Sequence, residues 1–298
     1  MPSIQSYLIH PLLRVFIKRK LSRVMDPMAA RASLNNPLPP PKGVRFAPEM
    51  IGGVPGEWVE SDKSGGTLLY LHGGGYFAGS PVTHRAITGA LALQGFRVFC
   101  PDYRLAPEHP FPAAVDDALA VYRAVLGLVP AGRLALGGDS AGGGLALALL
   151  LAARAAGLLM PACALLFSPW TDLACTGSSV VSNARRESML YGPRLLEGGA
   201  LYLNGADAKN PLASPLYGDL AGLPPLLIQA GAPEVLRDDS TRLAERARAA
   251  GVPVAFSLWQ NMPHAWQIYQ AFLPEARTAL REAGEFARAH LASAPAGA

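Results

Sequence analysis

Hydrophobic and polar residues alternate along this chain in blocks that predict an α/β fold. Short apolar runs with the length of buried strands recur, and most are followed by a longer stretch with helical spacing. The predicted strands lie at 57–60, 67–71, 96–100, 133–137, 163–167, 225–230 and 254–258. The predicted helices lie at 83–94, 113–126, 141–156, 192–203, 240–250 and 274–291. This alternation favours a mostly parallel sheet covered by helices on both faces.

Three segments depart from that rhythm. From Pro11 to Val24, apolar residues form a wide helical stripe, with Lys and Arg in the remaining positions. We expect this helix to cover an apolar cleft, the alternative being a position on a membrane surface. Residues 35–48 are rich in proline and are expected to form an extended connector. Residues 171–222 form an insertion that would sit over the carboxyl ends of the strands, where an open α/β sheet binds its ligand.

The charge balance argues against a nucleic-acid partner. Among 298 residues the formal net charge is +4, half of the residues are hydrophobic and 16% are charged. The densest basic patch, Lys18-Arg19-Lys20, fits a solvated helix face better than the broad basic surface that nucleic acids need. No segment approaches the roughly 20 apolar residues of a membrane span, so no stable membrane insertion is expected.

The cysteines and the N-terminus favour a cytoplasmic protein. Cys100, Cys163 and Cys175 are odd in number and widely spaced, so they are expected to be core thiols in a reducing compartment, without metal-ligand spacing. His10, Pro11 and Arg14 interrupt the apolar run near the N-terminus, which argues against a secretory signal.

One stretch carries the strongest chemical signal. The run that begins at Arg133 ends in Gly138-Asp139-Ser140-Ala141-Gly142, and an Ala- and Leu-rich helix follows. Gly-x-Ser-x-Gly between a strand and a helix is the nucleophile elbow of serine hydrolases. The small residues on either side of Ser140 let strand and helix approach closely, and the helix start points backbone N–H groups at the serine oxygen.

A glycine-rich loop supplies the expected partner of this serine. The strand at 67–71 runs into His72-Gly73-Gly74-Gly75-Tyr76. Backbone N–H groups of Gly73, Gly74 and Gly75, together with that of Ala141, are expected to form an oxyanion hole. In the loop at 101–112, Asp102, Arg104 and Glu108 are expected to form a charge network that pins the glycine loop.

A serine hydroxyl needs a base, and one of the six histidines stands where this topology puts it. His264 lies on the loop after the strand at 254–258, and the chain order Ser, acid, His then requires a carboxylate at 234–239. Glu234 is nearest the strand end and is preferred. Asp238 and Asp239 remain alternatives, although they are placed to cap the next helix.

The candidate substrate wall is apolar and aromatic. Trp170, Met189, Leu190 and Tyr191 lie in or beside the insertion, and Tyr76 follows the glycine loop. A role in the core of the cap is an equally open interpretation for the insertion residues. The predicted organisation is a cap segment at 1–45, a cap insertion at 171–222 and a catalytic domain at 46–170 and 223–298.

These motifs resemble the hormone-sensitive-lipase-like branch of the α/β-hydrolases, specifically its bacterial esterases. The matching stretches are His72–Tyr76, Asp102–Glu108, Gly138–Gly143 and Met262–His264. The resemblance implies that Ser140 is the nucleophile and His264 the base. Many members carry Asp-Pro-Leu where this chain has Glu234-Val235-Leu236, and some relatives carry glutamate there. It further implies a helical cap, short acyl substrates, a frequent homodimer and no metal or cofactor.

The sequence therefore predicts a serine carboxylesterase that acts on a small-molecule ester through a Ser-His-Glu triad. An amidase or a thioesterase would use the same triad. A non-catalytic small-ligand receptor is the main alternative outside enzymes, and it is disfavoured because His264 is present. Dehalogenase and epoxide hydrolase chemistry would need a carboxylate in place of Ser140.

Overall fold

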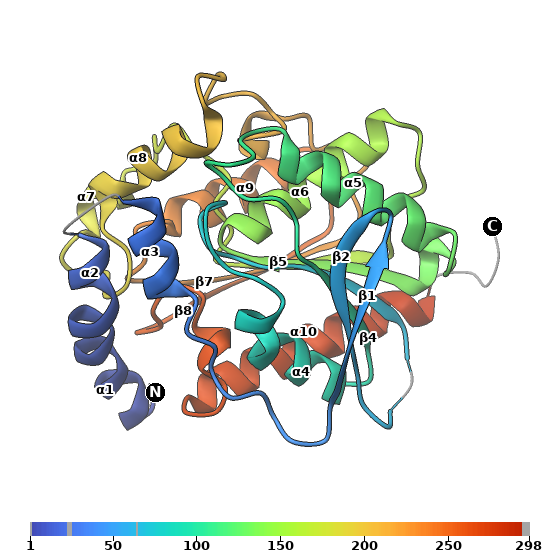
Figure 1. The fold of residues 1–298 in the computed structure, drawn as a ribbon, viewed down its shortest axis with the longest axis horizontal. Helices are drawn as coiled ribbons and strands as arrows, with labels where there is room; N and C mark the ends of the chain where they lie inside the picture. The colour runs from blue at the N-terminus through green and yellow to red at the C-terminus, as the bar shows by residue number, and fades with distance from the viewer. Residues whose placement is uncertain (1, 23–25, 64, 294–298) are drawn as a thin grey trace.

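The computed structural model describes residues 2–22, 26–63 and 65–293 and contains one eight-stranded sheet between two layers of helices (Figure 1). The strand order is β1-β2-β4-β3-β5-β6-β7-β8. Strands β3 to β8 run parallel, whereas β1 and β2 pair antiparallel at one edge. The strands are β1 (Arg45–Ile51), β2 (Val54–Glu60), β3 (Thr67–Leu71), β4 (Arg97–Pro101), β5 (Leu134–Asp139), β6 (Cys163–Phe167), β7 (Leu226–Gly231) and β8 (Val254–Trp259).

Helices cover both faces of this sheet, as the alternation of elements predicts. Helices α5, α6 and α9 lie on one face and α4 and α10 on the other (Figure 1). The helices are α1 (Ile4–Leu13), α2 (Arg19–Leu21), α3 (Pro27–Leu34), α4 (Arg85–Leu93), α5 (Ala113–Leu126), α6 (Ala141–Ala155), α7 (Ser179–Ser182), α8 (Gly192–Leu203), α9 (Arg237–Ala249) and α10 (Pro274–Ser293). The predicted α/β class is confirmed.

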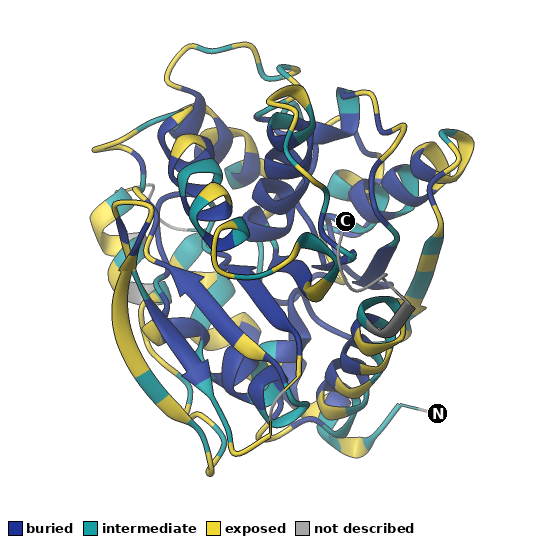
Figure 2. Ribbon diagram, turned by 90° about the vertical axis from the view of Figure 1, so that its right-hand side faces the viewer, coloured by how far each residue is buried: buried dark blue, intermediate teal, exposed yellow. Residues whose placement is uncertain are grey.

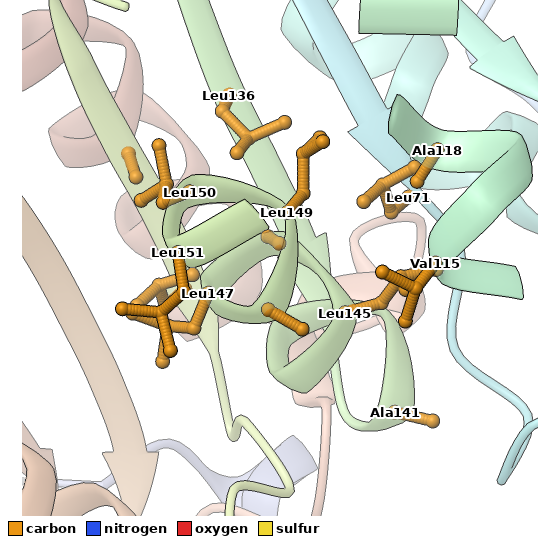
Figure 3. Packing of buried hydrophobic residues seen from close by; sticks show 14 of the residues in the cluster. Leu71, Val115, Ala118, Leu136, Ala141, Leu145, Leu147, Leu149, Leu150 and Leu151 are labelled. Carbon is orange, nitrogen blue, oxygen red and sulfur yellow. The ribbon is translucent and has the colours of Figure 1, made fainter. Parts of the chain in front are cut away.

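Two apolar cores follow from this layering. The central strands and the inner faces of the helices are buried, while exposed residues lie along the outer helix faces (Figure 2). The larger core packs α6 against the sheet and α5, and it includes Leu71, Val115, Leu136, Leu145 and Leu149 (Figure 3). Because α6 is almost wholly buried, the turn that precedes it is held on both sides.

The N-terminal region differs from its prediction in detail. Helix α1 begins at Ile4, where Ser3 accepts a hydrogen bond from the backbone N–H of Ser6, so Pro11 lies inside the helix rather than in its first turn. A π-helical turn (Arg14–Lys18) joins α1 to α2. The end of the predicted helix, Arg23 and Val24, lies outside the described residues. Helix α3 was not predicted; Asp26 caps it at the N–H of Met28.

The proline-rich connector was predicted too long. Residues 45–48 belong to β1, which includes Pro48 and lies at the sheet edge, where a missing N–H removes no ladder bond from a central strand. Helix α9 begins at Arg237, before the predicted residue 240.

The expected charge network within the loop at 101–112 is wrong. Arg104 pairs with Asp117 of α5 at 2.7 Å, and Glu108 pairs with Arg31 of α3 at 2.7 Å. Both partners lie outside the loop, and the loop itself contains no pair between Arg104 and Glu108. The loop still holds the glycine loop, but it does so through uncharged groups. The Tyr103 hydroxyl donates to the carbonyl of His72 at 2.6 Å, and the Ala106 N–H donates to the carbonyl of Tyr76 at 2.9 Å.

All three cysteines are free thiols. Cys100 and Cys163 are buried as expected, whereas Cys175 is only partly buried, so its placement in the core is wrong. Within the described residues, no helix combines the length and the apolar character needed to cross a membrane.

Candidate active site

Ser140 occupies the turn between β5 and α6 in a strained backbone conformation. Its φ is 54° and its ψ is −124°, values that non-glycine residues rarely adopt. A Cβ atom at Gly142 would collide with the carbonyl oxygens of Leu71 and His72, and one at Gly138 would collide with that of Gly142. Glycine at both positions therefore allows strand and helix to meet at this turn, as the spacing predicts.

The structure brings Ser140, His264 and Glu234 into one hydrogen-bonded chain. The Ser140 Oγ lies 2.8 Å from Nε2 of His264, and Nδ1 of His264 lies 2.8 Å from Oε2 of Glu234. His264 and Glu234 are almost fully buried, at 1% and 0% exposed. With Glu234 ionised, Nδ1 donates to it, which leaves the Nε2 lone pair facing the serine hydroxyl.

Glu234 is held by groups that sequence reasoning did not single out. Its Oε1 accepts hydrogen bonds from the Ser168 hydroxyl at 2.7 Å and from the backbone N–H of Gly231. Ser168 in turn accepts from the N–H of Ala265 at 3.2 Å, next to His264. Ser168 follows β6, Glu234 follows β7 and His264 follows β8, so three neighbouring strand ends meet here.

Asp238 and Asp239, the alternative acids, face the loop after β6 instead. The Asp238 carboxylate accepts from the Ser178 hydroxyl and the Ser179 N–H, at 2.7 and 2.9 Å. The Asp239 carboxylate accepts from the N–H groups of Thr171 and Asp172, at 2.8 and 2.9 Å. The expectation that they cap their own helix is not met: α9 has no side-chain cap, and these donors take one oxygen of each carboxylate.

The electrostatic surroundings shift the pKa of His264. Burial alone would lower the pKa of His264, but the hydrogen bond and charge of Glu234 outweigh it, with smaller contributions from Glu187 and Asp139. The net result is a pKa above the ordinary value of 6.5. The buried carboxylate of Glu234 thus strengthens the imidazole as a proton acceptor.

The glycine loop offers fewer free donors than expected. The N–H of Gly73 already donates to Nε2 of His84 and to Oδ1 of Asp139, both at 3.2 Å. Gly74 and Gly75 adopt positive φ values of 124° and 64° and line the same cavity as Ser140. Ala141 is the first residue of α6, where an N–H group has no partner within the helix. The donors left for an oxyanion are those of Gly74, Gly75 and Ala141.

Asp139 anchors this loop from beneath. It is 3% exposed and accepts from the Tyr70 hydroxyl at 2.8 Å as well as from Gly73. Burial would raise the pKa of Asp139, but the charge and hydrogen bond of His84 and the Tyr70 hydroxyl outweigh it and hold that pKa below its usual value. Burial also lowers the pKa of His72 to about 3, so this imidazole stays neutral beside His84.

A cavity of about 420 Å³ opens above Ser140 and His264. Trp170, Met189, Leu190 and Tyr191 line it, as do side chains from the N-terminal helices that were not singled out from the sequence. The additional apolar lining residues are Phe16, Ile17, Leu21, Leu34, Leu38, Phe77, Leu195, Leu236 and Ile268. The wall is therefore built from the N-terminal segment, the insertion and the strand ends together.

The placement of Tyr76 in the substrate wall is wrong. Tyr76 is 1% exposed and is absent from the cavity lining. Its ring stacks on that of Tyr202 in α8, with centroids 3.9 Å apart and an interplanar angle of 7°. A positive φ of 66° turns the side chain away from the glycine loop into this stack, which ties the loop to α8.

Thr83, His84 and Asp139 also line the cavity and bring nitrogen and oxygen atoms to it. Among the described residues, no group of three or more His, Cys, Asp and Glu side chains is arranged to hold a metal ion.

The fold and the site together define an α/β hydrolase with a serine at its elbow. A family defined by the alpha/beta hydrolase fold matches residues 68–268. An acetyl-hydrolase of Streptomyces hygroscopicus is 50% identical over 241 residues, which cover 80% of this chain and 81% of that protein. An esterase of Acinetobacter venetianus is 38% identical over 289 residues, which cover 94% of this chain and 95% of that protein.

Solved structures place the chain more narrowly. The crystal structure of an esterase from the bacterial hormone-sensitive lipase family matches with a TM-score of 0.90 and 40% identity, and it covers 98% of this chain and 99% of that one. The chain belongs to the α/β-hydrolase fold family, and within it to the hormone-sensitive-lipase-like bacterial esterases. The resemblance drawn from the motifs is thereby confirmed.

Proposed function

We propose that this chain is a serine carboxylesterase that hydrolyses short- to medium-chain acyl esters through a covalent acyl-enzyme. The observation that carries the proposal is the chain Ser140–His264–Glu234, with both contacts at 2.8 Å, at the floor of an apolar cavity. A nucleophile hydrogen-bonded to a base that a third group orients is the arrangement that activates a serine hydroxyl.

The mechanism follows from these contacts. His264 takes the proton of Ser140 through Nε2 while the serine oxygen attacks the ester carbonyl carbon. The N–H groups of Gly74, Gly75 and Ala141 stabilise the resulting oxyanion; losing one such donor costs about 2.7–4 kcal/mol in other serine hydrolases. His264 then gives the proton to the leaving alcohol as the ester C–O bond breaks. In the second half, His264 deprotonates a water that attacks the acyl carbon. The bond between the acyl carbon and the Ser140 oxygen then breaks as His264 returns the proton to that oxygen, and the carboxylic acid leaves.

The preference for small esters rests on the cavity. Its volume of about 420 Å³ is near the lower end of the range for small-molecule sites, and its walls are mainly apolar. One relative at 50% identity is named an acetyl-hydrolase, which fits a short acyl group. The serine at position 140 also fits amides and thioesters, so the chemistry of the leaving group requires a direct test.

The test is hydrolysis of p-nitrophenyl esters from acetate to palmitate by the wild type, Ser140→Ala and the control Ser182→Ala, whose serine is exposed on α7. We expect kcat/KM for acetate or butyrate to exceed that for palmitate by at least about tenfold. Activity should vanish in Ser140→Ala and persist in Ser182→Ala. Mass spectrometry after rapid quenching should find the acyl group on the peptide that contains Ser140. Turnover of anilides or thioesters without turnover of oxygen esters would contradict the proposed esterase activity. It would leave the proposed roles of Ser140, His264 and Glu234 unchanged.

A further inference from the structure

The N-terminal helix is apolar on two opposite sides. On its inner side, Ile9 and Leu13 are buried against Met262 and Trp266 beside His264. On its outer side, large apolar side chains point into solvent, with exposed fractions between 51% and 76%. This outer face consists of Ile4, Tyr7, Leu8, Leu12, Val15 and Phe16.

The outer face is continuous. Residues three and four apart are neighbours on a helix surface, and the spacing of Ile4, Leu8, Leu12 and Phe16 repeats every four residues. The π-helical turn Arg14–Lys18 follows α1 directly, so the stripe has no break. Figure 1 places these helices at the edge of the molecule, and Figure 2 shows exposed residues along them. Single exposed apolar residues are common, but a continuous stripe marks an interaction site.

The surroundings of the outer face are basic. Residues 1–25 contain five Lys and Arg residues and no Asp or Glu. Arg14, Arg19 and Lys20 are exposed. Arg14 also donates to the backbone carbonyls of Arg185 and Arg186 at 3.3 Å, which brings two more exposed arginines to the same edge.

The acidic groups packed near this segment are already engaged. Glu187 is 1% exposed, and its carboxylate accepts from the backbone N–H groups of Ser188, Met189 and Val235. Glu275 accepts from Ser3, and Glu197 pairs with Arg194. Of the exposed groups, Arg14, Arg19, Lys20, Arg185 and Arg186 outnumber the carboxylates of Asp26 and Glu197, so the field that reaches solvent from this edge is positive.

We propose that the outer face docks on the surface of an anionic lipid bilayer, with the N-terminal helix in the plane of the headgroups. Exposed aliphatic and aromatic side chains would enter the headgroup boundary while the surrounding arginines and lysines meet the anionic lipids. A second copy of this chain is disfavoured, because a two-fold contact places the same basic patch on both sides of the interface. A neutral apolar partner would leave the cations without counter-charges.

Docking in this orientation places the cavity at the lipid surface. Phe16 belongs both to the outer face and to the cavity lining, and Ile17, Lys20 and Leu21 follow it along the same wall. Amphiphilic esters concentrate at such a surface. The docked enzyme would therefore draw its substrate from the bilayer boundary rather than from bulk water. The proposal concerns where the protein binds, and it does not depend on the nature of the reaction.

The experiment is co-sedimentation of the full chain with vesicles of phosphatidylcholine alone or mixed with phosphatidylglycerol. The test variant Leu8→Gln/Leu12→Gln removes two outer-face side chains that do not line the cavity. The matched control is Leu128→Gln/Leu159→Gln, whose leucines are 59% and 61% exposed elsewhere. We expect the wild type and the control to bind the anionic vesicles. The test variant should bind at least about tenfold more weakly, and high salt should weaken all binding.

Two further measurements distinguish a loss of vesicle binding from a loss of folding and from a failure of the proposed esterase activity. Turnover of a soluble p-nitrophenyl ester should be unchanged in Leu8→Gln/Leu12→Gln, which shows that the variant is folded. Ser140→Ala should bind vesicles like the wild type, so a failure of the proposed esterase chemistry leaves this test intact. Equal binding by the test and control variants would overturn the proposal, as would absent binding of the wild type to anionic vesicles. A dimer in solution that the test variant abolishes, without vesicle binding, would assign the face to a second copy.

Discussion

Two effects act on the pKa of His264 in opposite directions. Burial favours the neutral imidazole, whereas the carboxylate of Glu234 at 2.8 Å favours the protonated one. The second effect prevails, and the pKa of His264 lies above 6.5. Only the neutral form accepts the proton of Ser140, so a raised pKa moves the loss of activity on acidification to higher pH.

This balance predicts the pH profile. The acidic limb of the kcat/KM profile reports the free enzyme. In the wild type, the apparent pKa read from this limb should lie above 6.5. Glu234→Gln removes the charge that raises the pKa, so the limb should move to lower pH. The neutral amide also holds the imidazole less well in its reactive tautomer, so kcat should fall by about 10²–10⁴-fold. The measurement is p-nitrophenyl butyrate hydrolysis between pH 5 and 9.

Asp238→Asn is the matched control, because its carboxylate faces Ser178 and Ser179. Its limb should coincide with that of the wild type. If Asp238→Asn shifted the limb and Glu234→Gln did not, the acid of the triad would have been assigned to the wrong residue.

At the scale of elements, the Gly142 position links β5, α6 and β3. An added Cβ would meet the backbone carbonyls of Leu71 and His72, which cannot move without moving β3 and the glycine loop. Gly142→Ala should therefore lower the free energy of unfolding by about 1–3 kcal/mol or more. Gly198 of α8 is the control, since an added Cβ there meets its nearest neighbour, Phe77, at 3.5 Å.

Thermal unfolding, monitored by circular dichroism, distinguishes the two alanine variants. Gly142→Ala should melt several degrees below the wild type, whereas Gly198→Ala should melt at or above it because alanine stabilises a helix interior by about 0.5–1 kcal/mol. Equal melting temperatures for Gly142→Ala and the wild type would show that strand and helix do not need this close approach.

Most of the strands that sequence reasoning located share one property, which is burial, although β8 was located without it. The apolar runs at β3, β5, β6 and β7 are wholly buried, so their hydrophobicity alone marks them. Strand β1 is mostly exposed and contains Pro48, and it forms only because β2 offers an antiparallel partner. No local pattern could show that.

The residues of the candidate site also fall into two groups, those that the sequence marks and those that it does not. Ser140, Glu234 and His264 each follow a strand, so chain order and topology pointed to Ser140 and His264 and favoured Glu234 over Asp238 and Asp239. Ser168 also follows a strand, but nothing in the sequence marks its role or that of His84, because these roles arise from contacts with Glu234 and Gly73 across the fold. The orientation of Tyr76 likewise depends on a stacking partner, Tyr202, more than one hundred positions away in the sequence.

At the scale of the whole molecule, α1 packs against residues from the C-terminal part of the chain. The N–H and hydroxyl of Ser3 donate to Glu275, and His10 lies 2.8 Å from the Ser188 hydroxyl and 3.1 Å from the carbonyl of Asn261. Leu13 packs with Met262 and Trp266, the residues on either side of the His264 turn. The N-terminal segment therefore supports the loop that carries His264, and it also lines the cavity.

Leu12 and Leu13 allow this support to be measured with neighbouring positions. Leu13 is 5% exposed and Leu12 is 51% exposed, so the same substitution removes a buried side chain in one case and a largely solvated one in the other. Leu13→Ala should destabilise the docked helix by about 2–5 kcal/mol. Leu12→Ala, assayed without lipid, should change it by less than about 0.5 kcal/mol. Hydrogen exchange should show faster opening of α1 and of the Met262–Trp266 loop in Leu13→Ala only, with a lower kcat for a soluble ester. Faster exchange in α1 with an unchanged kcat would mean that the Met262–Trp266 loop holds its position without the N-terminal helix.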